Sequence, residues 1–374
     1  MHTNRIMAEK KSKTIEAFFA IVRAGLWEKE VLLSPYGEVD FADVLQLAEE
    51  QSVVGIVASG VENVIDVKVA KRDVLPFITR VLSYESRNTE MNSFASYLVN
   101  RLYKEGVIPV LVKGQGIAQC YSKPGWRAAG DIDLLLGSYD YEKAKQVLLP
   151  IAQSVHSERR AKKHLGMTLA SVELELHGTL HTGLSNRIDK AIDSIQKNMF
   201  DNHRFRVWEV ENVNILLPSP DCDVIFVFTH ILQHFFKGGI GLRQICDWCR
   251  LLWTYSNQID RGLLYDRLSL MGLISEWNAF SLFAREYLGI PESAIPVFGK
   301  SEKWRARRLV EFILDSGNFG HNRDIGYQKK NYPAFIRKTI TFWRQVKDSI
   351  RLFFIFPKDS IVFLFGYVHS QITN

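Results

Sequence analysis

Apolar residues recur at helical spacing through the N-terminal part of the chain. This spacing predicts amphipathic helices over residues 14–27, over a segment that Asp40 caps, and over residues 53–61. One or two longer helices are expected over residues 74–103, with Gly106 as the stop signal. Because no polar chemistry clusters here, we expect a helical scaffold that packs beside the functional core.

The middle of the chain changes to short apolar runs and alternating patterns, which are typical of strands. Strands are expected at residues 107–112, 131–136, 164–169, 171–177 and within 204–217, and helices at residues 116–121, 139–151 and 188–199. After the Pro218-Ser219-Pro220 segment the pattern is helical again. We therefore predict an α+β protein with a helical region over 1–85, a small mixed-sheet core over 86–217 and a helical domain over 218–374.

Two aspartates begin the predicted strand at residues 131–136. Because side chains alternate along a strand, Asp131 and Asp133 share one face, while Ile132 and Leu134 point toward the core. Neighbouring carboxylates repel each other, and a hard cation such as Mg²⁺ between them relieves that repulsion. An isolated Asp-x-Asp sequence is also common at turns and at solvated strand ends.

A glycine turn, Lys113-Gly114-Gln115-Gly116, precedes the aspartates. Glycines let the backbone approach an anion and present N–H groups at the start of a helix, and Lys113 and Arg127 add positive charge. A lone turn of this kind is weak evidence. The order of strand, glycine turn, helix, arginine and then Gly130-Asp131-x-Asp133 is much more specific for a phosphate and metal site.

The predicted strand at residues 171–177 carries acids on one side only. Glu173, Glu175 and His177 face away from the apolar residues between them. A site with three carboxylates needs its third acid from a neighbouring strand, and Glu175 is the first candidate, with Glu173 second. A half-exposed strand with a polar outer face, and a purely structural His177, are the alternatives.

A polar cluster follows in the C-terminal part. His230 and His234 are four residues apart on one helical face, and Lys237, Arg243 and Asp247 follow across a glycine loop. Buried polar groups need partners, so we interpret this helix–loop–helix as a lid that binds phosphate or an acceptor substrate. Polar tips on a buried helix, and a simple Arg243–Asp247 pair one turn apart, are the alternatives.

Composition narrows the class of protein only slightly. With 47% hydrophobic and 24% charged residues the chain can bury a large core, and a net charge of +6 suits anionic partners of several kinds. No basic run interleaved with aromatics indicates a nucleic-acid groove, so nucleic acid is possible but not indicated. No segment is apolar enough to span a membrane, and no signal peptide is evident. The apolar C-terminal run is expected to form a buried helical hairpin, and a segment that lies on a membrane surface is the alternative. Four cysteines, interpreted as core thiols, indicate a cytoplasmic protein: Cys120, Cys222, Cys246 and Cys249.

These motifs together resemble the nucleotidyltransferase superfamily, specifically its uncharacterised bacterial branch. The resemblance covers about residues 85–252 and is carried by these residues: Lys113, Gly114, Arg127, Asp131, Asp133, Glu175-Leu176-His177, His230, His234 and 238–248. It implies a nucleotidyltransferase core and a Mg²⁺- or Mn²⁺-dependent transfer of NMP from NTP to a hydroxyl or phosphate acceptor that the sequence does not name.

The resemblance also implies roles for single residues. Asp131 and Asp133 would hold two Mg²⁺ ions, and Glu175 would complete this catalytic metal site and orient or deprotonate the acceptor hydroxyl. Nucleotide phosphates would bind at Lys113, Gly114, Gln115, Arg127 and Gly130, and the acceptor side would comprise His177, His230, His234, Lys237, Arg243 and Asp247. The superfamily carries Gly-Ser at the turn, whereas Gln115 follows Gly114 here. This departure motivates an alternative, a nucleotide- or phosphosugar-binding module without turnover, and a third hypothesis is a transferase that modifies a protein or RNA.

Overall fold

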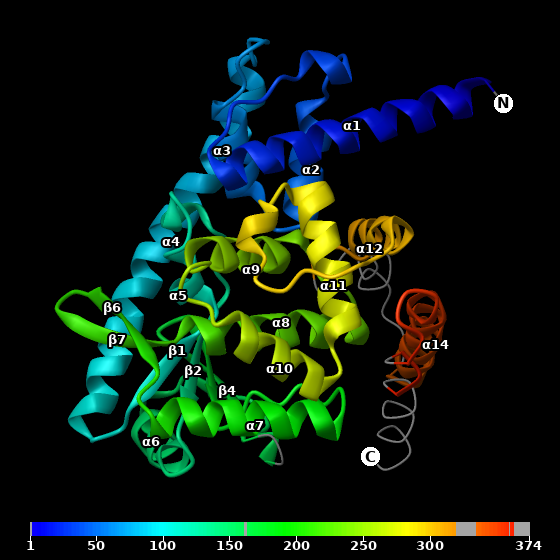
Figure 1. Cartoon of the computed structure of the whole chain (residues 1–374). Helices are drawn as coiled ribbons and strands as arrows, with labels where there is room; N and C mark the ends of the chain where they lie inside the picture. The colour runs from blue at the N-terminus through cyan, green and yellow to red at the C-terminus, as the bar shows by residue number, and fades with distance from the viewer. Residues whose placement is uncertain (1, 161–162, 319–333, 359, 363–374) are drawn as a thin grey trace.

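A seven-stranded mixed sheet lies at the centre of the core (Figure 1), and its strand order is β3-β4-β5-β2-β1-β7-β6. The computed structural model describes residues 2–160, 163–318, 334–358 and 360–362. The strands are β1 (Pro109–Val112), β2 (Asp131–Leu136), β3 (Ser154–Val155), β4 (His164–Leu169), β5 (Val172–His177), β6 (Phe205–Val210) and β7 (Val213–Pro218). The predicted α+β class is therefore confirmed.

The strands expected in the middle of the chain are all present. β2 has the predicted bounds, and the expected pair within residues 204–217 is the antiparallel hairpin of β6 and β7. β4 and β5 form a second hairpin, whose turn residues Ala170 and Ser171 have φ of 46° and 66°. β5 returns parallel to β2, so the acids of both strands start at the same edge of the sheet.

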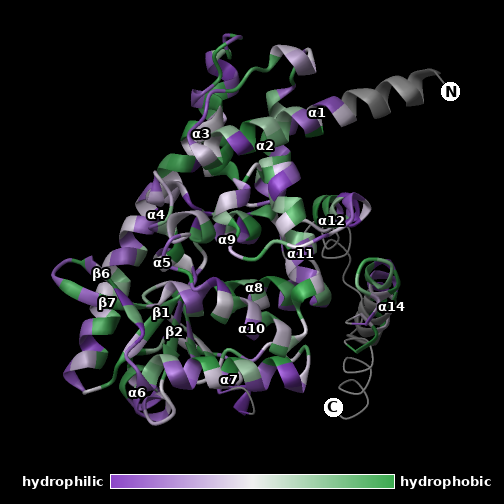
Figure 2. Ribbon diagram, viewed as in Figure 1, coloured by the Kyte–Doolittle hydropathy of each residue, from purple (hydrophilic) through white to green (hydrophobic). Residues whose placement is uncertain are grey.

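Helices cover both faces of this sheet. On one face Leu111, Ile132, Leu134 and Leu174 pack against α4 (Lys71–Lys104) and α6 (Asp140–Leu148). A 3-10 turn (Leu149–Ile151) completes the segment that was expected as one helix over 139–151. Figure 2 shows the central strands β1 and β2 in hydrophobic colour, whereas α7 (Asn186–Asp201) at the periphery alternates between polar and apolar residues.

The N-terminal scaffold is helical, as predicted, and consists of α1 (His2–Trp27), α2 (Phe41–Glu50), α3 (Val54–Glu62) and α4. Asp40 caps α2, since its side chain accepts from the backbone N–H groups of Ala42 and Asp43. Residues 74–103 belong to one long helix, which Gly106 follows in the left-handed region with φ of 67°. α1 and α3 approach so closely that a Cβ built on Gly25 would lie 1.8 Å from the Ile56 carbonyl oxygen.

The C-terminal part forms a second helical layer over the other face of the sheet. It comprises α8 (Pro220–Lys237), α9 (Leu242–Thr254), α10 (Arg261–Met271), α11 (Ile274–Phe283), the π-helical turn η5 (Ala284–Leu288), α12 (Lys303–Ser316) and α14 (Ala334–Phe353). Phe228, Trp248 and Trp277 pack at its centre, with ring centroids 4.8–5.4 Å apart. One continuous apolar cluster joins these helices to α1, α3 and the sheet residues Val110 and Val112.

Three expectations at the C-terminal side have different outcomes. The Pro218-Ser219-Pro220 segment is a tight connection rather than a loop, because β7 ends at Pro218 and α8 begins at Pro220. The cysteines are all buried free thiols, as expected. In the expected terminal hairpin, Ile355 and Phe356 are buried, and residues 363–374 lie outside the described part. Within the described ranges, each helix is too short or too polar for a bilayer crossing.

Candidate functional site

Three carboxylates from the neighbouring central strands β2 and β5 come together near the start of β2. The parallel register sets Asp133 of β2 beside Glu175 of β5, and Asp131 beside Glu173. Carboxylate oxygens of Asp131, Asp133 and Glu175 lie within 4.8 Å of one another. The Glu173 side chain lies toward β4 instead, where it accepts a 2.7 Å hydrogen bond from the Thr168 hydroxyl. The structure thus brings Glu175, the first candidate, to the aspartates.

The glycine turn lies directly beside these acids, between β1 and the short helix α5 (Gly114–Ala118). Lys113 and Gly114 have φ of 58° and 34°, and the left-handed region is strained for a lysine, by about 1–3 kcal/mol. The turn directs the Lys113 ammonium to Asp133, with Nζ 2.8 Å from Oδ1. Gln115 is 1% exposed, and its side-chain amide lies against the Met91 sulfur, so its side chain is not on the cavity wall.

Two histidines complete the cluster on the β4–β5 side. The Nε2 atom of His177 lies 2.7 Å from Asp133 Oδ1 and 3.3 Å from Glu175 Oε2. His164 Nε2 lies 3.1 Å from the same Glu175 oxygen. The sequence reasoning missed His164, although a signal was present. A turn at Ala170 and Ser171 pairs position 164 with position 177, and the structure has this register.

The acids differ strongly in their proton affinity. The neighbouring Asp133 and burial raise the pKa of Asp131 to about 6. Burial opposes the charge on Asp133, yet the Lys113 ammonium and the hydrogen bond with His177 outweigh it and lower the pKa of Asp133. His164 and His177 likewise lower the pKa of Glu175 against the effect of burial. His177 is buried, but its two carboxylate partners raise its pKa. The site is therefore rich in carboxylates, and Lys113 and His177 lie at close range to Asp133.

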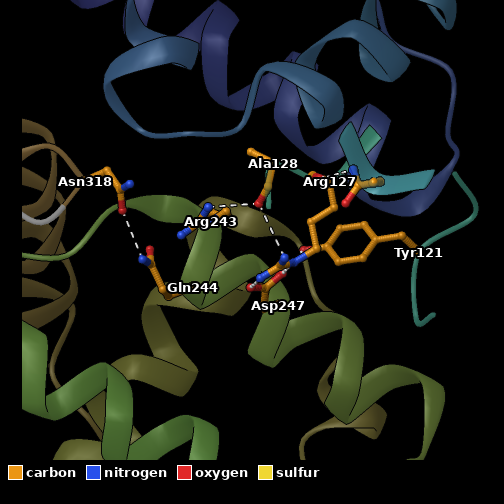
Figure 3. Close-up of polar contacts among 8 residues, drawn as sticks. Tyr121, Arg127, Ala128, Arg243, Gln244, Asp247 and Asn318 are labelled. Atoms are coloured by element: carbon orange, nitrogen blue, oxygen red, sulfur yellow. Dashed lines mark hydrogen bonds and ion pairs between the residues drawn. The ribbon is translucent and has the colours of Figure 1, made fainter. Parts of the chain in front are cut away.

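Arg127 and Asp247 form a buried ion pair that holds the loop before β2 against α9 (Figure 3). Arg127 Nε and Nη2 lie 2.8 and 2.7 Å from the two Asp247 oxygens, and the Tyr121 hydroxyl donates to Asp247 at 2.8 Å. The alternative of a simple Arg243–Asp247 pair is wrong. Arg243 instead donates to the Ala128 carbonyl at 2.9 Å. Asp247 is already bound by two donor nitrogens of Arg127, which reaches it from the loop before β2.

The acceptor-side candidates on α8 fall into two groups. His230 and His234 line the cavity, with ring centroids 4.4 Å apart. Burial and Lys113 lower the pKa of His230 well below its usual range and that of His234 to about 4, so both rings are neutral near pH 7. Lys237 is not among the cavity-lining residues, and its ammonium donates to the Thr182 carbonyl at 2.6 Å.

The residues that the sequence predicted for the site line one cavity of about 490 Å³, except Glu173, Gln115 and Lys237. Its walls are formed by the acid-bearing parts of β2 and β5, the glycine turn, α8 and the start of α9. Gly130 also lines it, beside Asp131. The sequence reasoning did not select several other lining residues: Arg159, Thr179, His181, Asp223 and Gln244. Asp223 had a signal, since it lies two helical turns before His230 on the same face of α8.

The donor set at the acid cluster fits a hard divalent cation. Asp131, Asp133 and Glu175 offer only oxygens, which Mg²⁺ and Mn²⁺ prefer, and they face a cavity with room for water and phosphate. The three residues would hold the ion together, with Lys113 at its side.

The chain belongs to the family described as uncharacterised nucleotidyltransferase, which matches it over residues 37–289. This match is wider than residues 85–252, where the motifs lie, and it reaches α2 and α3. Among curated proteins, none matches the chain. An antigenic nucleotidyltransferase-like protein from Paracoccidioides brasiliensis is similar in structure over 55% of this chain and 96% of its own, with 15% identity and a TM-score of 0.33.

Proposed function

We propose that the chain transfers a nucleoside monophosphate from an NTP to a hydroxyl or phosphate acceptor. The observation that carries this proposal is the meeting of three carboxylates from β2 and β5 beside the glycine turn and Lys113, on the wall of a 490 Å³ cavity. Membership of the nucleotidyltransferase family supports the same reaction class.

The nucleotide would bind at the turn between β1 and α5. Backbone N–H groups in the first turn of a helix lack intrahelical partners, so the segment after Lys113 can donate to phosphate oxygens. Gly130 leaves space beside Asp131, since a Cβ built there would meet no atom within 4 Å. A bound Mg²⁺ or Mn²⁺ would neutralise phosphate charge and lower the pKa of the attacking hydroxyl.

The acceptor would enter along α8. His230 and His234 are neutral, so their rings can accept a hydrogen bond from a hydroxyl and would orient it. Arg243 lies on the same wall, and within the described residues its buried Nε has no hydrogen-bond partner. Arg127 would act through its pair with Asp247, which fixes the loop that leads into β2.

Asp131→Ala tests the metal and catalytic assignment. Because the variant removes one of three carboxylates that offset the cation, Mg²⁺-dependent pyrophosphate release should fall at least about a hundredfold, with the unfolding midpoint nearly unchanged. Glu173→Ala is the matched control, since this acid is paired with Thr168 and should leave turnover within a few-fold. Normal turnover by Asp131→Ala would show that the acid cluster is not the catalytic site.

A second candidate is a nucleotide- or phosphosugar-binding module without turnover. The buried side chain of Gln115, in the place where the superfamily has serine, favours it, because no hydroxyl faces the cavity at this turn. Pyrophosphate release should be measured with each NTP against a panel of sugar phosphates, RNA and protein acceptors. Saturable NTP binding without release for any acceptor would favour the binding module, and release with one class would identify the acceptor.

The four buried thiols support a cytoplasmic setting for either candidate.

A further inference from the structure

The feature that the proposed reaction does not use is the pair of imidazoles on β4 and β5. His164 and His177 face each other across the antiparallel ladder, with ring centroids 4.8 Å apart and planes tilted by 45°. Their Nε2 atoms both point at one oxygen of Glu175, at 3.1 and 3.3 Å. A single carboxylate oxygen therefore lies within hydrogen-bond distance of two imidazole nitrogens, one on each strand.

These spacings match the edge of a zinc tetrahedron. Ligand atoms at about 2.0–2.1 Å from a tetrahedral Zn²⁺ are separated from one another by about 3.3–3.4 Å. One ligand atom from each of His164, His177 and Glu175 lies within 4.8 Å of the other two, which places the three donors around one position for an ion. All three residues line the cavity, which leaves a fourth position for water or substrate.

The ligand type separates this cluster from the acid site beside it. Asp131, Asp133 and Glu175 offer oxygens alone, whereas His164, Glu175 and His177 offer two nitrogens and one oxygen. Imidazole favours transition metals, and two histidines with one glutamate is a ligand set found in catalytic zinc sites.

We propose that His164, His177 and Glu175 form a transition-metal site that selects Zn²⁺ over Mg²⁺ and shares Glu175 with the acid site. Binding would replace the hydrogen bond between His177 and Asp133, and Asp133 would keep Lys113 as its partner. This inference goes beyond the proposed function, because the proposed nucleotidyl transfer is assigned to hard cations at the acid site.

Co²⁺ is the probe, because its visible spectrum distinguishes low-coordinate nitrogen ligation from octahedral oxygen ligation. The full chain is stripped with a chelator, held in saturating Mg²⁺ to fill the oxygen site, and titrated with Co²⁺. We expect one equivalent to bind with an intense visible band that Zn²⁺ removes and excess Mg²⁺ does not.

His164→Gln is the diagnostic variant, since His164 contributes to this cluster and not to the acid cluster. It should lose the band and more than about tenfold in Co²⁺ affinity. His156→Gln is the matched control, because the exposed His156 imidazole lies 4.0 Å from Glu173 and is not part of the cluster, and it should keep the wild-type spectrum. Asp131→Asn should also keep it. X-ray absorption of the Zn²⁺-loaded wild type, with two nitrogens at about 2.0–2.1 Å, serves as the second measurement should His164→Gln misfold.

A weak octahedral spectrum that Mg²⁺ abolishes, or equal affinity in His164→Gln and wild type, would overturn the zinc site. Oxygen-only ligation in the absorption spectrum would do the same. These outcomes leave Mg²⁺-dependent pyrophosphate release untouched, so the proposed function survives them. Conversely, normal turnover by Asp131→Ala would show that the acid cluster is not the catalytic site, and no pyrophosphate release with any acceptor would overturn the transferase assignment. Both outcomes leave the Co²⁺ result intact.

Discussion

Asp131 and Asp133 are the same residue type on the same strand face, yet the protein shifts their pKa values in opposite directions. Asp133 lies between Lys113 and His177, which favour its charge. Asp131 faces the Asp133 charge and, among the described residues, forms no ion pair, so its pKa rises to about 6. Without bound metal, Asp131 is therefore half protonated near pH 6, and a cation that binds there must displace the proton.

This competition predicts a pH dependence for metal binding. Below about pH 6 Asp131 is protonated, and a cation must displace that proton, so the Mn²⁺ affinity should fall about tenfold per pH unit there and change less above pH 7. Titration calorimetry or Mn²⁺ paramagnetic resonance between pH 5 and 8 measures it. In Asp131→Asn the affinity should be lower throughout and depend less on pH between 7 and 5. A flat wild-type profile across that range would contradict the assignment.

At the scale of elements, the register between neighbouring strands decides which side chains come together at this site, and the pattern within one strand decides only which face they occupy. Alternation along β5 predicted which side Glu175 and His177 face, and the hairpin turn fixed His164 opposite His177. The partner of Asp247 could not be predicted in this way. Arg243 is its helical neighbour in sequence, but the loop after the 3-10 turn η2 (Pro124–Trp126) brings Arg127 to α9 instead.

The Arg127–Asp247 pair predicts a large loss of stability when one partner is removed. Both side chains are less than a tenth exposed, so Asp247→Ala leaves a buried guanidinium without its counterion and should lower the free energy of unfolding by about 3–5 kcal/mol. Denaturant unfolding measures the loss. Asp201→Ala is the control, because its helical pair with Lys197 is exposed and should cost less than about 1 kcal/mol. Equal losses in the two variants would argue against a structural role for the buried pair.

At the scale of the whole molecule, the regions before and after the sheet are joined by buried polar contacts. Arg250 of α9 donates to the Cys120 carbonyl and to the Leu26 carbonyl, both at 2.7 Å, and pairs with Glu28 at 3.1 Å. Gln51 accepts from the Leu242 N–H group at 3.1 Å. The N-terminal helices, the core and α9 are thus parts of one polar and apolar network.

Arg250→Met should destabilise the whole chain as a unit. It leaves two buried carbonyls without donors, each costing about 1–3 kcal/mol, so we expect a loss of about 2–6 kcal/mol. Far-ultraviolet circular dichroism and tryptophan fluorescence should report the same lowered midpoint. Arg285→Met is the control, since Arg285 makes solvent-accessible pairs with Glu286 and Glu292 and should change little. Separate transitions for the two probes would show independent units instead.

The sequence by itself determined the elements and the acids. Periods of about 3.6 and 2 residues depend only on neighbouring positions, so the helices, the strands and the shared face of Asp131 and Asp133 could be read directly. The tertiary structure alone decided that β5 lies parallel beside β2, that Arg127 pairs with Asp247, and that Gln115 turns away from the cavity. Those contacts join residues far apart in the chain, and packing and electrostatics between elements select them, which no local pattern encodes.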